Sequence, residues 1–361
     1  MASDWTINDV IARLGPGPDV KPSSAPYYFP QENTSRVMLA VESMRRHMTD
    51  EGWELALSLE ATGYKLAGNN CVINLTDVYE IVRRLKPGVV VVQDKREWDA
   101  GHSRRDFRNP ADRFQHIDYL SHRPDIFKLT VLKDAHQTPE YHKESADEMG
   151  CHAWITYYHP RIVTHLAPYV RPQHLIRIHH TINPLYFPQE ITKRHGGLFS
   201  GAVSAAYPLR QRLLGEINSL PEIKRLVHPG YGANGCKTPD FIKELSKYKL
   251  AICTASKFGY ALRKMVEATA AGCVVLTDLS MDEVLPGGID GNMVRIHPNW
   301  PTYRISNIIR EVYDTYDPIR QAEFAHKART WYDYKAAGIR LAVDIETMRA
   351  NYNAVSAIPV R

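Results

Sequence analysis

The sequence predicts an α/β protein of two doubly wound domains, each built on a parallel sheet, followed by C-terminal helices. Its 361 residues are enough for two domains, and 44% of them are hydrophobic, which supplies two cores. Strand and helix patterns alternate along both halves, and this favours parallel sheets. The run VVVVQD at 89–94 is apolar without alternation, which is typical of a strand buried on both faces.

The domain limits follow from where this alternation starts and stops. Residues 1–34 are rich in proline and predict an arm on the surface. A first α/β domain is expected over 35–185 and a second over 186–330, because 184–195 combines prolines with polar residues. Residues 331–361 predict helices that pack back on the first domain.

Individual elements follow from hydrophobic period and from turn residues. In the first domain we expect helices over 50–63, ended by Gly63, and over 76–88, with Thr76 as N-cap and Gly88 just past the end. The expected strands lie at 36–41, 71–75 (or a turn there), 89–94, 126–136, 152–158 and 175–183. In the second domain they lie at 196–204, 223–229, 249–256 and 273–278, with helices at 208–220, 239–248 and 260–271.

Composition excludes several classes of protein. No apolar run reaches the length of a membrane span, and residues 1–17 lack the pattern of a secretory signal. The cysteines are scattered, which argues against disulfides or a zinc cluster and for a cytoplasmic location. The net charge of +5 suits an anionic donor, a polyanionic acceptor or a membrane surface.

The stretch KFGYALRKMVEATAAGCVVLTD at 257–278 is the most informative. Arg263 and Lys264 fall in the first turn of its predicted helix, where positive charge opposes the helix dipole. An anion held at this end would reverse that effect, and a diphosphate is the expected anion. Glu267, one turn further on, is placed to accept hydrogen bonds from a ribose diol. The alternative is a solvated helix face.

The run Glu267-Ala268-Thr269-Ala270-Ala271-Gly272-Cys273-Val274-Val275 resembles the donor-binding domain of group 1 (retaining, GT-B) glycosyltransferases. In that family a glutamate opens the pattern E-A-x-A-x-G-x-x-V and binds the donor ribose. With HPGYG at 228–232, the sequence is most similar to a subgroup of CgeB-like and phage proteins. The resemblance covers roughly residues 150–345.

This resemblance implies two Rossmann-like domains that face each other across a cleft. Residues 35–185 would bind the acceptor, and residues 186–330 would bind a nucleoside-diphosphate sugar, with a UDP-sugar expected. The phage subgroup also implies DNA modification, with a hydroxymethylated DNA base as acceptor; a glycan is the other acceptor considered.

The chain departs from the family at two places that concern the donor. Gly259 stands where the family has a second acidic residue, and the segment 201–207 lacks the family's basic residues. Arg263, Lys264 and Arg210 are therefore expected to neutralise the phosphates, beside a backbone turn at 201–204. The predicted donor-binding residues are Gly201, Ser204, Arg210, Tyr260, Arg263, Lys264 and Glu267.

Catalytic candidates follow two strands of the first domain, where ligands bind in open α/β sheets. Asp134 and His136 end the strand at 126–136, and Asp94 ends the strand at 89–94. His136 is expected to bind the sugar, and Asp134 or Asp94 to take the acceptor proton. Ordinary loop residues are the alternative, and inversion and retention both stay open.

Residues 230–238 resemble the P-loop motif of NTPases, but that motif needs glycine directly before Lys-Thr, and Cys236 stands between them. There is no Asp-x-Asp, so we expect no metal and a metal-independent, hexosyltransferase-like enzyme. Residues 95–123 interleave arginines with aromatics, which suits DNA as a polyanionic acceptor or simply a solvated loop. The rival functions are a sugar-nucleotide epimerase or phosphorylase, and a nucleic-acid-binding protein with a degenerate transferase domain.

Overall fold

The structure, a computed structural model, describes residues 35–40, 54–93, 114–132, 139–189, 194–227 and 238–356. The predicted arm at 1–34, the glycine-containing segment 228–237 and residues 95–113 lie outside these ranges. The chain forms two compact units, which we describe separately. Within the described ranges, the N-terminal unit comprises residues 35–179 and 334–356, and the C-terminal unit comprises residues 180–333.

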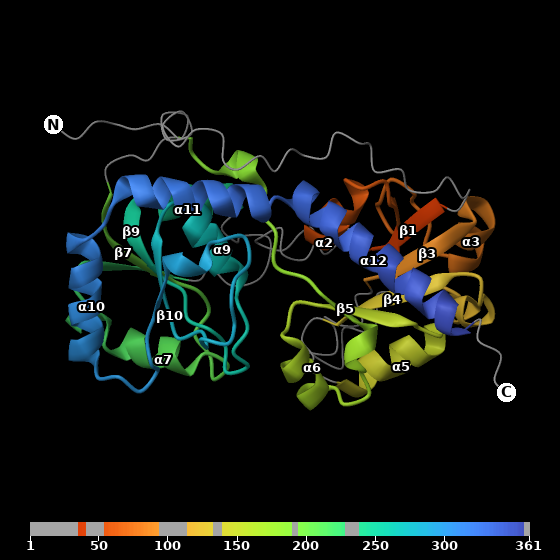
Figure 1. Ribbon diagram of the computed structural model, residues 1–361, viewed down its shortest axis with the longest axis horizontal. Coiled ribbons are helices and arrows are strands. Elements are labelled where there is room, and N and C mark those ends of the chain that lie inside the picture. The colour runs from red at the N-terminus through yellow and green to blue at the C-terminus, as the bar shows by residue number, and fades with distance from the viewer. Residues whose placement is uncertain are drawn as a thin grey trace. The chain divides into compact units, whose positions relative to one another are not determined.

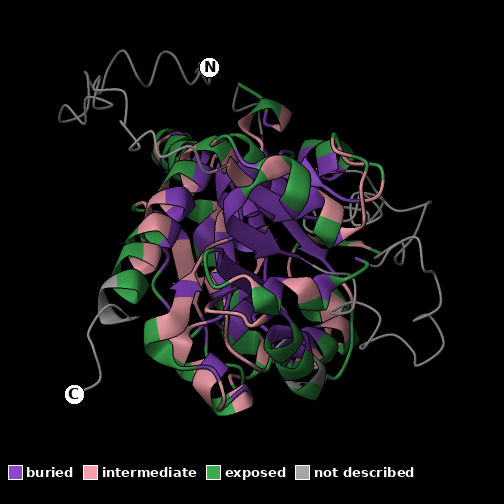
Figure 2. Ribbon diagram, turned by 90° about the vertical axis from the view of Figure 1, so that its right-hand side faces the viewer, coloured by how far each residue is buried: buried purple, intermediate pink, exposed green. Residues whose placement is uncertain are grey.

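A parallel six-stranded sheet is the centre of the N-terminal unit, in the order β2-β1-β3-β4-β5-β6 (Figure 1). Its strands are β1 (Ser35–Leu39), β2 (Lys65–Ala67), β3 (Pro87–Val92), β4 (Phe127–Leu132), β5 (Ala153–Thr156) and β6 (Leu175–Arg177). Every residue of β3 and β4 is buried, so both faces of the central strands are covered, as the run of apolar residues predicts. Figure 2 shows this sheet in purple beneath more exposed helices.

The helices of this unit are α2 (Glu54–Glu60), α3 (Val78–Leu85), α5 (Pro139–Met149), α6 (Pro160–Leu166) and α12 (Tyr334–Ser356), with short 3-10 helices η4 (Ile117–His122) and η5 (Pro172–His174). α12 packs against α2 (Figure 1). A methyl group on Gly338 of α12 would overlap the carbonyl oxygen of Ser58. The two helix backbones therefore touch at this glycine.

The predicted ends of α3 are wrong by one or two residues. Asp77, not Thr76, is the N-cap: its carboxylate accepts the N–H groups of Tyr79 (2.9 Å) and Glu80 (3.4 Å). At the other end Lys86 adopts a left-handed conformation, with φ of 46°, and ends the helix before Gly88 is reached. β3 starts directly after this residue, so the glycine serves the strand instead.

The C-terminal unit contains a parallel five-stranded sheet in the order β11-β10-β9-β7-β8. Its strands are β7 (His195–Ser200), β8 (Ile223–Leu226), β9 (Tyr248–Ile252), β10 (Val274–Thr277) and β11 (Met293–Arg295). The edge strands β2 and β11 were not predicted, because three residues are too few to show a period. The expected strand or turn at 71–75 is a turn with one isolated bridge at Ile73.

The helices of this unit are α7 (Pro208–Gly215), α8 (Thr238–Leu245), α9 (Arg263–Ala270), α10 (Thr302–Asp314) and α11 (Pro318–Trp331), with 3-10 helices η6 (Pro184–Tyr186), η7 (Ile217–Ser219) and η8 (Asp290–Asn292). α9 is shorter than the expected helix over 260–271. Its N-cap, Leu262, has extended backbone angles, so residues 260 and 261 precede the helix.

Both faces of the C-terminal sheet carry a hydrophobic core. Leu198 of β7 packs in a cluster with α8 and α9, whereas its neighbour Phe199 packs in a second cluster with α7 and α10. β10 alternates in the same way, with Val275 in the first cluster and Leu276 in the second. Helices on both faces of a parallel sheet make this unit doubly wound, as predicted.

We expect Gly338→Ala to lower the free energy of unfolding by about 1–3 kcal/mol, because the added methyl group forces α12 away from Ser58. Gly215→Ala in α7 is the matched control, since a methyl group there meets nothing within 4 Å. This control should be as stable as the parent or slightly more stable. Urea unfolding followed by circular dichroism measures both, and equal stability of the two variants would contradict the close packing.

Candidate functional site

The carboxyl edge of the C-terminal sheet is where this topology places a ligand. The chain runs from β7 outward to β8 and then crosses back past β7 to β9, so the strand order reverses between β7 and β9. In open doubly wound sheets a crevice forms at such a reversal, outside the carboxyl ends of the two strands. Gly201 directly follows β7 at this edge, and Thr254 lies just past β9.

Arg210 joins the two loops beside this crevice. Its side chain is buried, with 3% of the residue exposed, and Nη1 donates to the carbonyl of Ala202 at 2.8 Å. Nε donates to the hydroxyl of Thr254 at 3.0 Å, and Nη2 donates to the carbonyl of the same residue at 3.2 Å. The guanidinium also lies 4.0 Å from the ring centroid of Tyr207. Arg210 thus places a guanidinium group at the crevice.

A second cationic side chain, that of Lys264, lies at Gly201 beside Arg210. The φ of Gly201, +117°, lies in the region that favours glycine. A methyl group at this position would lie 2.7 Å from Nη1 of Arg210 and 2.8 Å from Nζ of Lys264. Two cationic groups therefore lie against one backbone turn. Such an arrangement suits a phosphate, which takes charge-assisted hydrogen bonds from side chains and from backbone N–H groups.

Two arginine side chains bind the carboxyl end of α9. Arg329 Nε donates to the carbonyl of Ala270 at 2.8 Å, and Arg194 Nη2 donates to the carbonyl of Ala271 at 2.5 Å. Burial lowers the pKa of Arg329 to about 10, which keeps it charged at neutral pH and favourable to the helix dipole. At the amino end, the apolar side chain of Leu262 accepts no hydrogen bond from the first N–H groups. The amino end of a helix favours an anionic ligand.

Arg263 and Glu267 form an ion pair on α9. Arg263 Nε donates to Oε1 of Glu267 at 2.9 Å, and the two residues are 4% and 1% exposed. The alternative of a solvated helix face fails for both residues, because both are buried. Lys264, the next residue after Arg263, is half-buried and faces Gly201 instead.

The structure thus brings the predicted donor-binding residues together in two groups, Gly201 with Arg210 and Lys264, and Arg263 with Glu267. Ser204 lies in the turn after Gly201, is exposed, and accepts the N–H of Ala206 at 3.3 Å. Tyr260 is half-buried and precedes α9. The catalytic candidates Asp94, Asp134 and His136 lie outside the described residues.

Two polar residues of this edge were missed by the sequence analysis, Thr254 and Asp278. Asp278 directly follows β10, and its carboxylate accepts the N–H of Ala255 at 2.7 Å. Burial raises the pKa of Asp278, although this hydrogen bond and the charge of Arg210 act in the opposite direction. The signal was present for Asp278, which ends the predicted strand at 273–278, the kind of position that singled out Asp94 and Asp134. Thr254 falls inside the predicted strand at 249–256, which ends earlier in the structure, at Ile252.

Some kinds of site are not found in the part of the chain that the structure describes. No group of three or more His, Cys, Asp or Glu residues is placed to hold a metal there. Cys71, Cys151, Cys253 and Cys273 form no disulfide bonds. None of the described helices combines the length and the apolar character needed to cross a bilayer.

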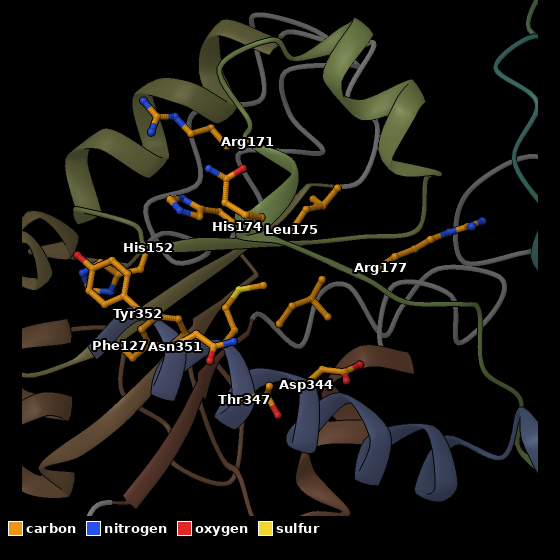
Figure 3. Close-up of a pocket in the computed structure, with 13 residues that line it drawn as sticks. Phe127, His152, Arg171, His174, Leu175, Arg177, Asp344, Thr347, Asn351 and Tyr352 are labelled. Carbon is orange, nitrogen blue, oxygen red and sulfur yellow. The ribbon is translucent and has the colours of Figure 1, made fainter. Parts of the chain in front are cut away.

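A separate cavity of about 770 Å³ lies in the N-terminal unit, beside β6, the edge strand of the sheet (Figure 3). One wall is the segment from Arg171 to Arg177, and the other is a stripe of α12 from Asp344 to Tyr352. The rings of His152 and Tyr352 lie 4.5 Å apart at one end. No predicted site residue lines this cavity.

Comparisons of the sequence with protein-family models and with curated proteins find no match. The fold does have relatives among solved structures. A sucrose-phosphate synthase from Thermosynechococcus elongatus superposes with a TM-score of 0.57 at 10% identity, over 88% of this chain and 100% of that one. A glycosyltransferase from Rickettsia africae superposes with a TM-score of 0.53 at 10% identity, over 88% of this chain and 99% of that one.

A third relative is Anabaena HepE, whose structure holds UDP-glucose. It gives a TM-score of 0.53 at 11% identity, over 87% of this chain and 99% of that one. Together with the two parallel sheets, these likenesses establish the fold, which is the GT-B fold of two Rossmann-like domains. The similarity to the CgeB-like and phage subgroup gains no support from them.

We expect Gly201→Ala to destabilise the protein more than Gly259→Ala. Both glycines have positive φ, so alanine costs about 1–2 kcal/mol at either position. Only at Gly201 does the new methyl group also collide with Arg210 and Lys264, whereas at Gly259 it meets nothing within 4 Å. Urea unfolding of both variants measures the difference. A Gly259 variant that loses as much stability as the Gly201 variant would show that the two cations do not lie against this turn.

His152 should make the stability depend on pH. Burial, with the charges of Lys128 and His174, lowers its pKa to about 4, against about 6.5 in an unfolded chain. The unfolded chain therefore binds more protons between these values, and the free energy of unfolding should fall as the pH drops from 6.5 to 4. His152→Asn does not titrate, yet it can still accept the N–H of Lys128, which Nδ1 now accepts at 3.1 Å. The free energy of unfolding should differ less between pH 7 and pH 4.5 in this variant than in the native protein. An equal difference in both proteins would contradict the lowered pKa of His152.

Proposed function

We propose that this protein is a glycosyltransferase that moves a sugar from a nucleoside-diphosphate sugar, a UDP-sugar, to an acceptor hydroxyl. The observation that carries the proposal is the meeting of Arg210 and Lys264 at Gly201. This cluster lies at the switch point of a doubly wound sheet, before a helix whose N-cap residue, Leu262, makes no side-chain cap hydrogen bond. The GT-B fold, which Anabaena HepE shares while holding UDP-glucose, supports the same reading.

In this proposal the diphosphate lies against the Gly201 turn. Arg210 and Lys264 neutralise it, and backbone N–H groups of the turn and of α9 bind its oxygens. Negative charge on the diphosphate grows as the bond to the sugar breaks, so fixed cations stabilise the transition state more than the bound donor. These groups supply the charge that a metal would otherwise provide, and we propose a metal-independent, hexosyltransferase-like reaction.

The nucleoside end of the donor is assigned to α9 and the residues before it. Glu267 would accept hydrogen bonds from the ribose diol, and Arg263 lies beside it. Tyr260 precedes the helix, and Ser204 lies in the turn after β7, so we propose that both complete the donor site.

The acceptor is assigned to the N-terminal unit. β3 and β4 are neighbouring parallel strands, so the segments that follow them start at the same edge of the sheet. These segments carry Asp94, Asp134 and His136. We propose that His136 binds the sugar and that Asp134 or Asp94 takes the acceptor proton if the reaction inverts. A glycan and a hydroxymethylated DNA base are the proposed acceptors, and the free cysteines fit a cytoplasmic location.

Lys264→Met should raise the Kd for UDP about 10- to 100-fold, because a charge-assisted hydrogen bond contributes about 1.5–3 kcal/mol. Lys243→Met is the matched control, since Lys243 is exposed on α8 of the same unit and should leave the Kd unchanged. Isothermal titration calorimetry measures both. Equal UDP affinity in the two variants would remove the diphosphate assignment.

Incubation of the protein with a panel of nucleotide sugars separates the proposed activity from its rivals. A transferase consumes the donor faster when the right acceptor is present. Epimerisation of the donor without an acceptor, or sugar transfer to inorganic phosphate, would instead indicate the epimerase or phosphorylase. Salt-dependent DNA binding without nucleotide affinity would favour a degenerate transferase domain.

A further inference from the structure

Arg263 and Lys264 are adjacent in sequence but have different partners. Successive residues of a helix point about 100° apart, so the two side chains leave α9 in different directions. Lys264 is the one that faces the Gly201 turn, because a methyl group on Gly201 would lie 2.8 Å from its Nζ. Arg263 points along the helix to Glu267, four residues on, and donates to its carboxylate.

The ion pair between Arg263 and Glu267 is buried in the protein and does not lie on its surface. The side chains of Arg263 and Glu267 are 5% and 2% exposed. Removing two charges from water is costly, and hydrophobic residues of similar size often give equal or greater stability. A buried ion pair is therefore weak evidence of a stabilising role. What it does provide is a carboxylate whose position is fixed by a guanidinium.

We infer that Arg263 is a positioning residue, which orients Glu267 toward the ribose diol of the donor and does not itself bind phosphate. This inference rests on the proposed function. A carboxylate has about four sites for hydrogen bonds, so it can hold Arg263 and a ligand hydroxyl together. The donor site then divides into two parts along α9: Arg263 with Glu267 recognises the nucleoside, and Lys264 with Arg210 recognises the diphosphate.

This division makes a specific prediction about ligands that differ only at the ribose. UDP has the diol and 2′,3′-dideoxy-UDP lacks it, whereas their diphosphates are the same. The native protein should bind UDP at least tenfold more tightly. Arg263→Met should abolish this preference, because Glu267 is no longer held in place. Lys264→Met should raise the Kd of both ligands by the same factor and leave the preference for UDP unchanged.

The Kd values of both ligands for the native protein and each variant, from isothermal titration calorimetry, provide the test. If Arg263→Met raises the Kd of both ligands by the same factor and leaves the preference for UDP unchanged, Arg263 contacts the phosphates and the inference is overturned. If the native protein binds both ligands with equal affinity, the ribose assignment fails while the diphosphate site stands. If it binds no nucleotide at all, the proposed function fails with it.

Loss of the buried partner can itself unfold the protein, so the melting temperature of each variant is measured alongside. Arg263→Lys supplies the comparison if Arg263→Met does not fold. Lysine keeps a positive charge but lacks the planar guanidinium that donates from Nε. We expect the preference for UDP to fall severalfold in this variant. A preference as strong as in the native protein would contradict the positioning role.

Discussion

The candidate site depends on the hydrogen bonds that fix the carboxyl end of α9. Arg329 and Arg194 bind the last carbonyls of the helix from the core of the C-terminal unit, and the Tyr316 hydroxyl donates to the carbonyl of Gly272 at 2.9 Å. A helix is rigid over eight residues, so fixing this end also fixes the other. The amino end of α9, with Lys264, is thereby held beside the Gly201 turn.

The second constraint is the backbone at Gly201. Only a residue without a side chain leaves room for Arg210 and Lys264 to lie against it, and its positive φ turns the chain away at the end of β7. Arg210 is in turn held by Thr254, so the loops after β7 and β9 are tied together by one guanidinium. The charge at the switch point is thus built into the packing of the unit, because Arg210 and Thr254 are both buried.

The two units illustrate different limits of sequence reasoning. Both sheets were predicted from apolar runs and from strand–helix alternation. In the C-terminal unit Gly201, Arg210 and Lys264 lie together, and their role in donor binding stays a prediction. In the N-terminal unit Asp94, Asp134 and His136 stay predictions, as do their roles in catalysis. The cavity beside β6 had no signal in the sequence, because its walls come from segments that begin at Arg171 and Asp344 and meet only in the fold.

The sequence by itself determined the parallel doubly wound sheets and the location of the cationic helix, since period, apolar runs and glycine positions act over a few neighbouring residues. The tertiary structure decided what those residues do. It placed Thr254 on Arg210 across 44 positions of the chain, started α9 at Arg263, and sent two adjacent cations to different partners. Such choices depend on which distant segments pack beside a residue, and no local pattern encodes that.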